Sequence, residues 1–210
     1  MLLDLTPLPA FLLASMVVVL TPGVDVFLLL RTSLNSGRRA GLFALAGIHT
    51  ASIIQVAVVI SGLGALITSN PAVLSVLKWI GAAYLVYLAA TILRGLWLTR
   101  RESAAGTLTT APADAANPYL RGLFSNLTNP KMLLFSLAFL PQFVGAAAQP
   151  ALQLVLLGVV FLVLAAIWEL AIVLGAARIA TRLQDPRVAK SLDVVSAAAF
   201  LTISVGLVAS

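Results

Sequence analysis

Cysteine is absent from the sequence, histidine occurs once, and only 10% of the residues are charged, against about 25% in an average soluble domain. These absences exclude a disulfide framework, a thiolate metal site, a cysteine nucleophile and a multi-histidine metal site. Hydrophobic residues make up 61% of the 210 residues, more than an ordinary soluble domain, a disordered chain or a small secreted module contains. The composition therefore predicts an all-α, polytopic membrane protein.

Six long apolar runs dominate the sequence, and each is near the roughly 20 residues that a membrane-crossing helix needs. Alternating strands of about ten residues, which would indicate a β-barrel, do not occur. We therefore expect six transmembrane helices. The runs are Leu8 to Leu30, Leu42 to Ile67, Val73 to Leu93, Gly122 to Phe143, Ala151 to Ala177, and Val188 to Val208.

The basic residues indicate the orientation of these spans. The net charge is +6, and Lys and Arg gather after the first, third and fifth runs, for example at Arg38, Arg100 and Arg182. The other two connections carry no charge, so the positive-inside rule places the basic connections in the cytoplasm and both termini outside. Because the basic residues are confined to these connections, no basic surface remains to bind a nucleic-acid backbone, and we do not expect nucleic-acid binding.

A flexible Ala-, Thr- and Pro-rich linker at residues 99–120 divides the chain into two halves of three spans, residues 1–98 and 121–210. An odd number of crossings per half gives the halves opposite orientations, so related halves form an inverted 3+3 repeat. Leu20-Thr21-Pro22-Gly23 in the first run and Leu127-Thr128-Asn129-Pro130 in the fourth occupy corresponding places. We therefore expect that the halves are related and that helices one and four are broken.

Pro22 and Pro130 explain why those two helices should break. Proline lacks the N–H group and clashes with the carbonyl one turn back, so each proline releases backbone polar groups. Within a membrane such groups survive only in the protein interior or beside a watery cavity, where half-helix ends offer partial charges to a ligand. A simple kink is the alternative for either proline alone, whereas the matched pair favours a binding site.

Four ionisable residues from four spans lie at similar depths. Counting from the cytoplasmic ends places Asp25 roughly 9 Å deep, and His49, Lys131 and Glu169 roughly 13–15 Å deep. Such charges are costly near the bilayer centre, so we expect them to line one polar cavity. There Lys131 would bind a carboxylate, Asp25 or Glu169 an ammonium group, and His49 a proton.

The same residues also allow purely structural interpretations. Asp25 and Lys131 could simply neutralise each other, His49 could be a hydrogen-bonded interior histidine, and Glu169 could face a protomer interface. His49, Ser52 and Gln55 follow each other at helical spacing. The small residues Gly41, Gly47, Gly81 and Gly158 would let helices approach closely.

Several motifs of the sequence occur together in a known family. They are Thr21-Pro22-Gly23-Val24-Asp25, Ser33 to Leu42, Gly81-Ala82-Ala83-Tyr84-Leu85, Gly122 to Lys131, and Phe139-Leu140-Pro141-Gln142-Phe143. Together they resemble the motifs of the lysine/homoserine-threonine exporter family (LysE/RhtB). The resemblance covers nearly the whole chain, although this chain has Pro22-Gly23-Val24 where the family often has Pro-Gly-Pro. The resemblance implies proton-driven efflux of an amino acid from the bacterial cytoplasm across the inner membrane, by a homodimer.

The spans, the polar layer and the resemblance together predict an amino-acid exporter that works by proton-coupled antiport with alternating access. A divalent-cation exporter of similar architecture is the alternative, followed by a membrane-embedded enzyme and a purely structural protein. The exporter hypothesis requires no enzyme activity, no cofactor and no metal. Under this hypothesis a small-molecule substrate and protons cross the lipid bilayer through the protein. The candidate substrate-binding residues are Pro22, Gly23, Asp25, Asn126, Asn129, Pro130 and Lys131, and the candidate proton-coupling residues are His49 and Glu169.

Overall fold

A computed structural model describes residues 2–69, 71–99, 117–129, 132 and 135–209. These residues form helices and no strands, which confirms the all-helical prediction. The elements are α1 (Leu8–Leu20), α2 (Val24–Ser69), α3 (Pro71–Thr99), α4 (Pro118–Leu127), the π-helix η1 (Phe135–Phe139), the 3-10 helix η2 (Leu140–Phe143), α6 (Pro150–Leu174), α7 (Ala176–Gln184) and α8 (Pro186–Ala209). The expected linker 99–120 falls mostly outside the described residues.

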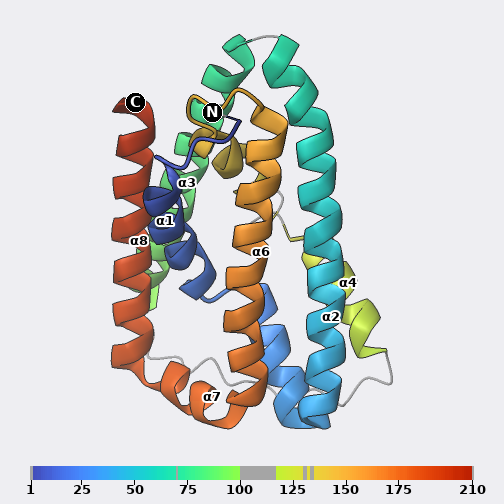
Figure 1. The fold of residues 1–210 in the computed structure, drawn as a ribbon. Helices are drawn as coiled ribbons and strands as arrows, with labels where there is room; N and C mark the ends of the chain where they lie inside the picture. Colours follow the sequence, from blue (N-terminus) through green and yellow to red (C-terminus); the bar gives the residue numbers. More distant parts are fainter. Residues whose placement is uncertain (1, 70, 100–116, 130–131, 133–134, 210) are drawn as a thin grey trace.

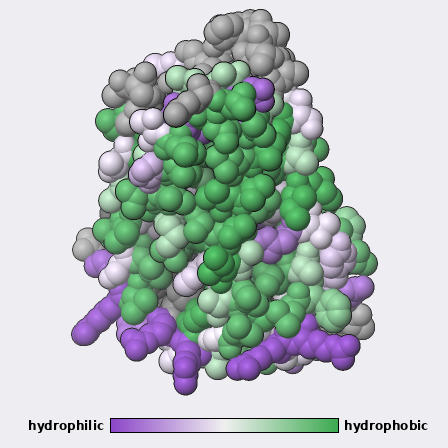
Figure 2. Space-filling model, viewed as in Figure 1, coloured by the Kyte–Doolittle hydropathy of each residue, from purple (hydrophilic) through white to green (hydrophobic). Residues whose placement is uncertain are grey.

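Three helices of the described chain are long and apolar enough to cross a membrane: Val24–Gly62, Pro150–Leu174 and Pro186–Val205. Leu8–Leu20 and Ala82–Leu96 are shorter apolar helices. Figure 2 shows a broad hydrophobic face above a hydrophilic end. The membrane class is therefore consistent with the structure, while the inverted six-span arrangement stays a prediction.

The helices run between two different ends of the molecule (Figure 1). The N-terminal segment and the last turn of α8 lie at one end, which we call the terminal end. The turn at Gly37 and helix α7 lie at the other, which we call the basic end because Arg38, Arg39, Arg178 and others are exposed there.

At the basic end the first connection is much tighter than expected. Instead of an open connection that leads to a helix at Leu42, α2 reverses at Gly37, whose φ of 82° and ψ of 168° separate two helical segments. Glycine adopts such a positive φ without steric cost. Beyond the turn, a Cβ on Gly41 would collide with the side chain of Ser33, so the two segments pack closely.

Helix α7 was also not expected, because the sequence indicates only a basic connection between the fifth and sixth runs. Its inner face buries Ala176 and Ala180, and its outer face exposes Arg178 and Arg182. The helix lies across the basic end and joins α6 to α8 (Figure 1). Nine residues are too few for helical periodicity to stand out beside two long apolar runs.

Helix α4 packs closely against the second segment of α2. A Cβ on Gly47 would collide with the carbonyl oxygen of Tyr119, and a Cβ on Gly122 with that of Ala44. Two glycines therefore let the backbones touch, as small residues do between membrane helices. The Tyr119 hydroxyl also donates to Thr50 Oγ1 over 3.2 Å. These contacts hold the first half of α4 against α2.

Candidate functional site

A small cavity lies where α1 gives way to α2. Its volume is about 40 Å³, room for roughly three water molecules. Apolar side chains, including those of Val18 and Phe161, form part of its wall. Asp25, Asn129 and Glu169 also line it. The cavity thus combines two carboxylates with an apolar surface.

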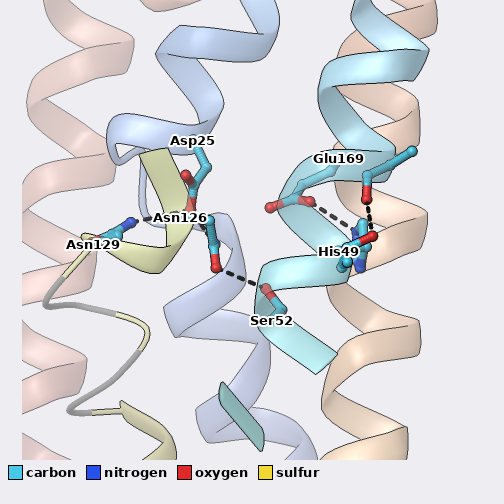
Figure 3. Close-up of polar contacts among 8 residues, drawn as sticks. Asp25, His49, Ser52, Asn126, Asn129 and Glu169 are labelled. Carbon is cyan, nitrogen blue, oxygen red and sulfur yellow. Dashed lines mark hydrogen bonds and ion pairs between the residues drawn. The ribbon is translucent and has the colours of Figure 1, made fainter. Parts of the chain in front are cut away.

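Asp25 occupies the first turn of α2, directly after the interruption at Thr21–Gly23. The side chain is buried, with 8% of its surface exposed. Its Oδ2 accepts hydrogen bonds from Asn126 Nδ2 at 3.0 Å and Asn129 Nδ2 at 3.1 Å (Figure 3). Amide donors and the N-terminal end of a helix both stabilise a carboxylate. The first helix break thereby places a supported negative charge at the cavity wall.

Helix α2 in turn holds the end of α4. Ser52 Oγ donates to Asn126 Oδ1 over 3.3 Å. Gln55 Nε2 donates to the backbone oxygens of Asn126 at 3.0 Å and Leu127 at 3.3 Å. The last carbonyls of a helix lack partners within that helix and need others in an apolar surrounding. Gln55 satisfies two of them and so orients Asn126 toward Asp25.

The second carboxylate is paired with the single histidine. His49 Nε2 lies 3.0 Å from Glu169 Oε2, and the two side chains are 18% and 13% exposed. His49 precedes Ser52 by one helical turn, so neighbouring positions of α2 contact two polar groups (Figure 3). Glu169 also lines the cavity. One face of α2 thus joins the Glu169 pair to the Asp25 cluster.

The structure brings together most of the residues that the sequence singles out. Gly23 lines the cavity, and Asn126 and Asn129 both bind Asp25. Pro22 lies in the interruption between α1 and α2. The remaining candidates, Pro130 and Lys131, lie outside the described residues, and so does the expected contact between Lys131 and Asp25.

Two contacts of the site were missed by sequence reasoning. In the sequence, Gln55 is only one of several polar residues at helical spacing, although an amide in an apolar run is itself a signal. Thr21 Oγ1 donates to Ser196 Oγ over 2.8 Å and so ties the first interruption to α8. Among the described residues, no group of three His, Cys, Asp or Glu side chains is placed to hold a metal ion.

Comparison with known proteins agrees with a membrane translocator. The family described as LysE type translocator matches residues 16–210. A homoserine/homoserine lactone efflux protein of Salmonella typhimurium is 31% identical over 195 residues, which cover 92% of each chain. A leucine efflux protein of Salmonella choleraesuis is 32% identical over 160 residues, 76% of this chain and 71% of the relative.

An uncharacterized membrane protein of Pseudomonas aeruginosa is 30% identical over 179 residues, 85% of this chain and 83% of the relative. No solved structure matches the chain. The matched length and identity show that the chain belongs to the LysE family of translocators, which confirms the family resemblance of its motifs.

Proposed function

We propose that the protein exports an amino acid or a close derivative. The observation that carries this proposal is a buried carboxylate, Asp25, held by two amides at the wall of a part-apolar cavity. Such a cavity suits a small molecule with an ammonium group and an apolar part. The relatives named for homoserine and leucine efflux support the same substrate class.

Different parts of the substrate would contact the two interrupted segments and helix α6. The ammonium group would bind Asp25, which a charge-assisted hydrogen bond favours, and the side chain would contact Val18 and Phe161. In our proposal Lys131 and the backbone near Pro130 bind the substrate carboxylate. Because the cavity holds only about 40 Å³, the substrate enters when the helices move apart, as alternating access requires.

Proton coupling would follow from competition for the cavity carboxylates. An ammonium group and a proton both neutralise Glu169 or Asp25, so binding of one weakens binding of the other. His49 is placed to exchange a proton with Glu169 across 3.0 Å. A proton that enters from outside would then release the amino acid, and departure of that proton on the inside would reset the site. This cycle is an antiport.

The proposed setting is the bacterial inner membrane, with both termini outside and the protein present as a homodimer. Support for the orientation comes from the two ends of the molecule, since exposed arginines gather at the end opposite to the termini (Figures 1 and 2). In this proposal, residues 1–98 and 121–210 form the inverted halves, and the cavity lies where their broken helices meet.

The direct test is efflux of a panel of labelled amino acids from cells that overproduce the protein, with and without a proton gradient. We expect efflux of at least one neutral amino acid, faster with the gradient than without it. Efflux indifferent to the gradient would contradict antiport. Protection of the cells against a divalent cation, without any amino-acid efflux, would support the cation-export alternative instead.

A further inference from the structure

Three buried serine hydroxyls have no hydrogen-bond partner among the described residues. Ser33 Oγ lies near the turn at Gly37, and the other two are Ser15 Oγ in α1 and Ser136 Oγ in the π-helix η1. Ser15 and Ser136 are both 0% exposed. Hydroxyls elsewhere in the chain, such as those of Ser61 and Thr202, donate to a carbonyl four residues back. A buried hydroxyl without a partner is energetically costly, so those of Ser15 and Ser136, which are fully buried, call for an explanation.

The two serines occupy matching positions beside the cavity. Ser15 lies one helical turn before Val18 and Val19, and Ser136 follows Met132 by four residues; these three neighbours all line the cavity. Helix α1 begins near the terminal end of the molecule (Figure 1), so Ser15 lies nearer to that end than Val18 and Val19 do. Phe139 lies beside Phe11 of α1, so η1 leads from Met132 toward the same end. Each serine is therefore the next polar residue of its own segment beyond the cavity on that side.

Beyond the serines, three phenylalanine rings pack against each other. The centroid of Phe11 lies 5.9 Å from that of Phe139 and 5.3 Å from that of Phe143, and the latter two lie 4.8 Å apart. Phe11 precedes Ser15 by four residues, and Phe139 follows Ser136 by three. The order of cavity, serine and phenylalanine is thus the same on both elements.

We propose that α1 and η1 line the route from the cavity to the terminal end, with Ser15 and Ser136 as a second polar subsite and the three phenylalanines as its gate. This inference rests on the proposed export function. A hydroxyl accepts from an ammonium group and donates to a carboxylate, so the pair suits a zwitterionic amino acid. Two neutral hydroxyls bind such a molecule less strongly than Asp25 does, which favours release.

The helices that would have to move to open this route are suited to such movement. The π-helix η1 and the following 3-10 helix η2 are irregular, and π-turns occur frequently at functional sites. At the terminal end of the proposed route, the N-terminal segment is fastened to the loop after η2 and to α6. Ala146 N donates to Asp4 Oδ2 over 2.9 Å, and Gln153 Nε2 donates to Asp4 O over 2.6 Å.

The absence of cysteine makes a direct test simple, since Ser15→Cys and Ser136→Cys each introduce the only thiol in the chain. The probe is a small cationic methanethiosulfonate applied outside intact cells. Ser204→Cys is the matched control, because Ser204 is also buried but donates to Ala82 O in the contact between α8 and α3. Phe143→Leu, combined with each of the two serine variants, tests the gate.

We expect both thiols on the route to react about ten times faster than the control, since modification follows access to the thiolate, and faster still with Phe143→Leu. Rates equal to the control in all backgrounds would overturn the route. Modification of the thiols needs no amino-acid substrate, so the test distinguishes failure of the route from failure of the proposed export function. Fast reaction without efflux of any amino acid in the labelled panel would refute the export function alone, and efflux with slow reaction would refute the route alone.

Discussion

The two interrupted segments of the molecule, residues 8–36 and 118–143, meet at one cavity but interrupt their helices in different ways. In the first, α1 ends at Leu20 and α2 begins at Val24, so a helix starts beside the cavity and presents Asp25. In the second, α4 ends at Leu127 and the next described elements are η1 and η2. One segment supplies the charge, and the other supplies amide donors.

This difference explains why the second segment needs outside support. A new helix starts at Val24, and its N-terminal end favours the negative charge of Asp25, whereas the end of α4 has carbonyls that need donors. Those donors come from Gln55 of α2, which binds the oxygens of Asn126 and Leu127. The charged half of the site is therefore built locally, and the amide half depends on packing between helices.

The largest expected effect is that of Asp25→Asn. The substitution keeps the size of the side chain but removes the charge that would hold an ammonium group. We expect efflux to fall by about 100-fold, as loss of one buried ion pair of about 3 kcal/mol would give. Labelled-leucine efflux from vesicles, at equal protein levels in the membrane, is the measurement. Asp185→Asn, at the exposed turn before α8, is the control, and unchanged transport by Asp25→Asn would remove this carboxylate from the mechanism.

A smaller effect is expected for Gln55→Leu, which tests the supported half of the site. Loss of the amide leaves two carbonyls of α4 unpaired and costs about 1–3 kcal/mol, so efflux should fall by about tenfold. Gln55→Glu keeps the shape but lacks the NH₂ donor, and we expect it to resemble Gln55→Leu. Ser61→Ala is the control on the same helix, because Ser61 donates only to its own helix. Full activity of Gln55→Leu would show that the end of α4 supports itself.

The His49–Glu169 pair should affect coupling more than transport itself. We expect Glu169→Gln to export labelled leucine down its own gradient, with no acceleration when a proton gradient is added. We expect efflux by His49→Gln to lose its dependence on pH in the same way, because Glu169 would have no histidine with which to exchange a proton. A proton response like that of the unmodified protein in both variants would place coupling elsewhere.

The smallest effect is expected at Asp4, outside the interrupted segments. Hydrogen bonds, first from the backbone N–H of Ala146 and then from Thr6, lower the pKa of Asp4 below its ordinary 3.8. Its stabilising contribution is therefore fully present above pH 3.8 and is lost as the pH falls through the lowered pKa of the folded state. Asp4→Asn should lower the unfolding temperature slightly at neutral pH. The difference should vanish in acid, and a difference independent of pH would contradict this assignment.

Sequence reasoning found the parts of this site that depend on local chemistry. Long apolar runs show that the chain is helical and suits a membrane, and Pro22 marks the place where α1 gives way to α2. Asp25 and Glu169 stand out because a charge in an apolar run needs a reason. These signals depend on residue type and position along the chain, which are visible without a structure.

The remaining features depend on direction around a helix axis or on tertiary contact. Depth along a helix does not say which way His49 faces, so its contact with Glu169 became visible only in the structure. Gly37 does not stand out among several glycines near the basic end, although it alone among the described residues of that turn has a positive φ. The role of Gln55 requires α4 to lie beside α2.

The most direct measurement of the central claim asks whether the ammonium group of the substrate binds the Asp25 carboxylate. In vesicles that contain the protein, efflux of labelled leucine or homoserine is measured with unlabelled amino acid or its N-acetyl derivative as competitor. We predict that the free amino acid competes and that the N-acetyl compound, which lacks the positive charge, does not. Equal competition by both compounds would contradict the account.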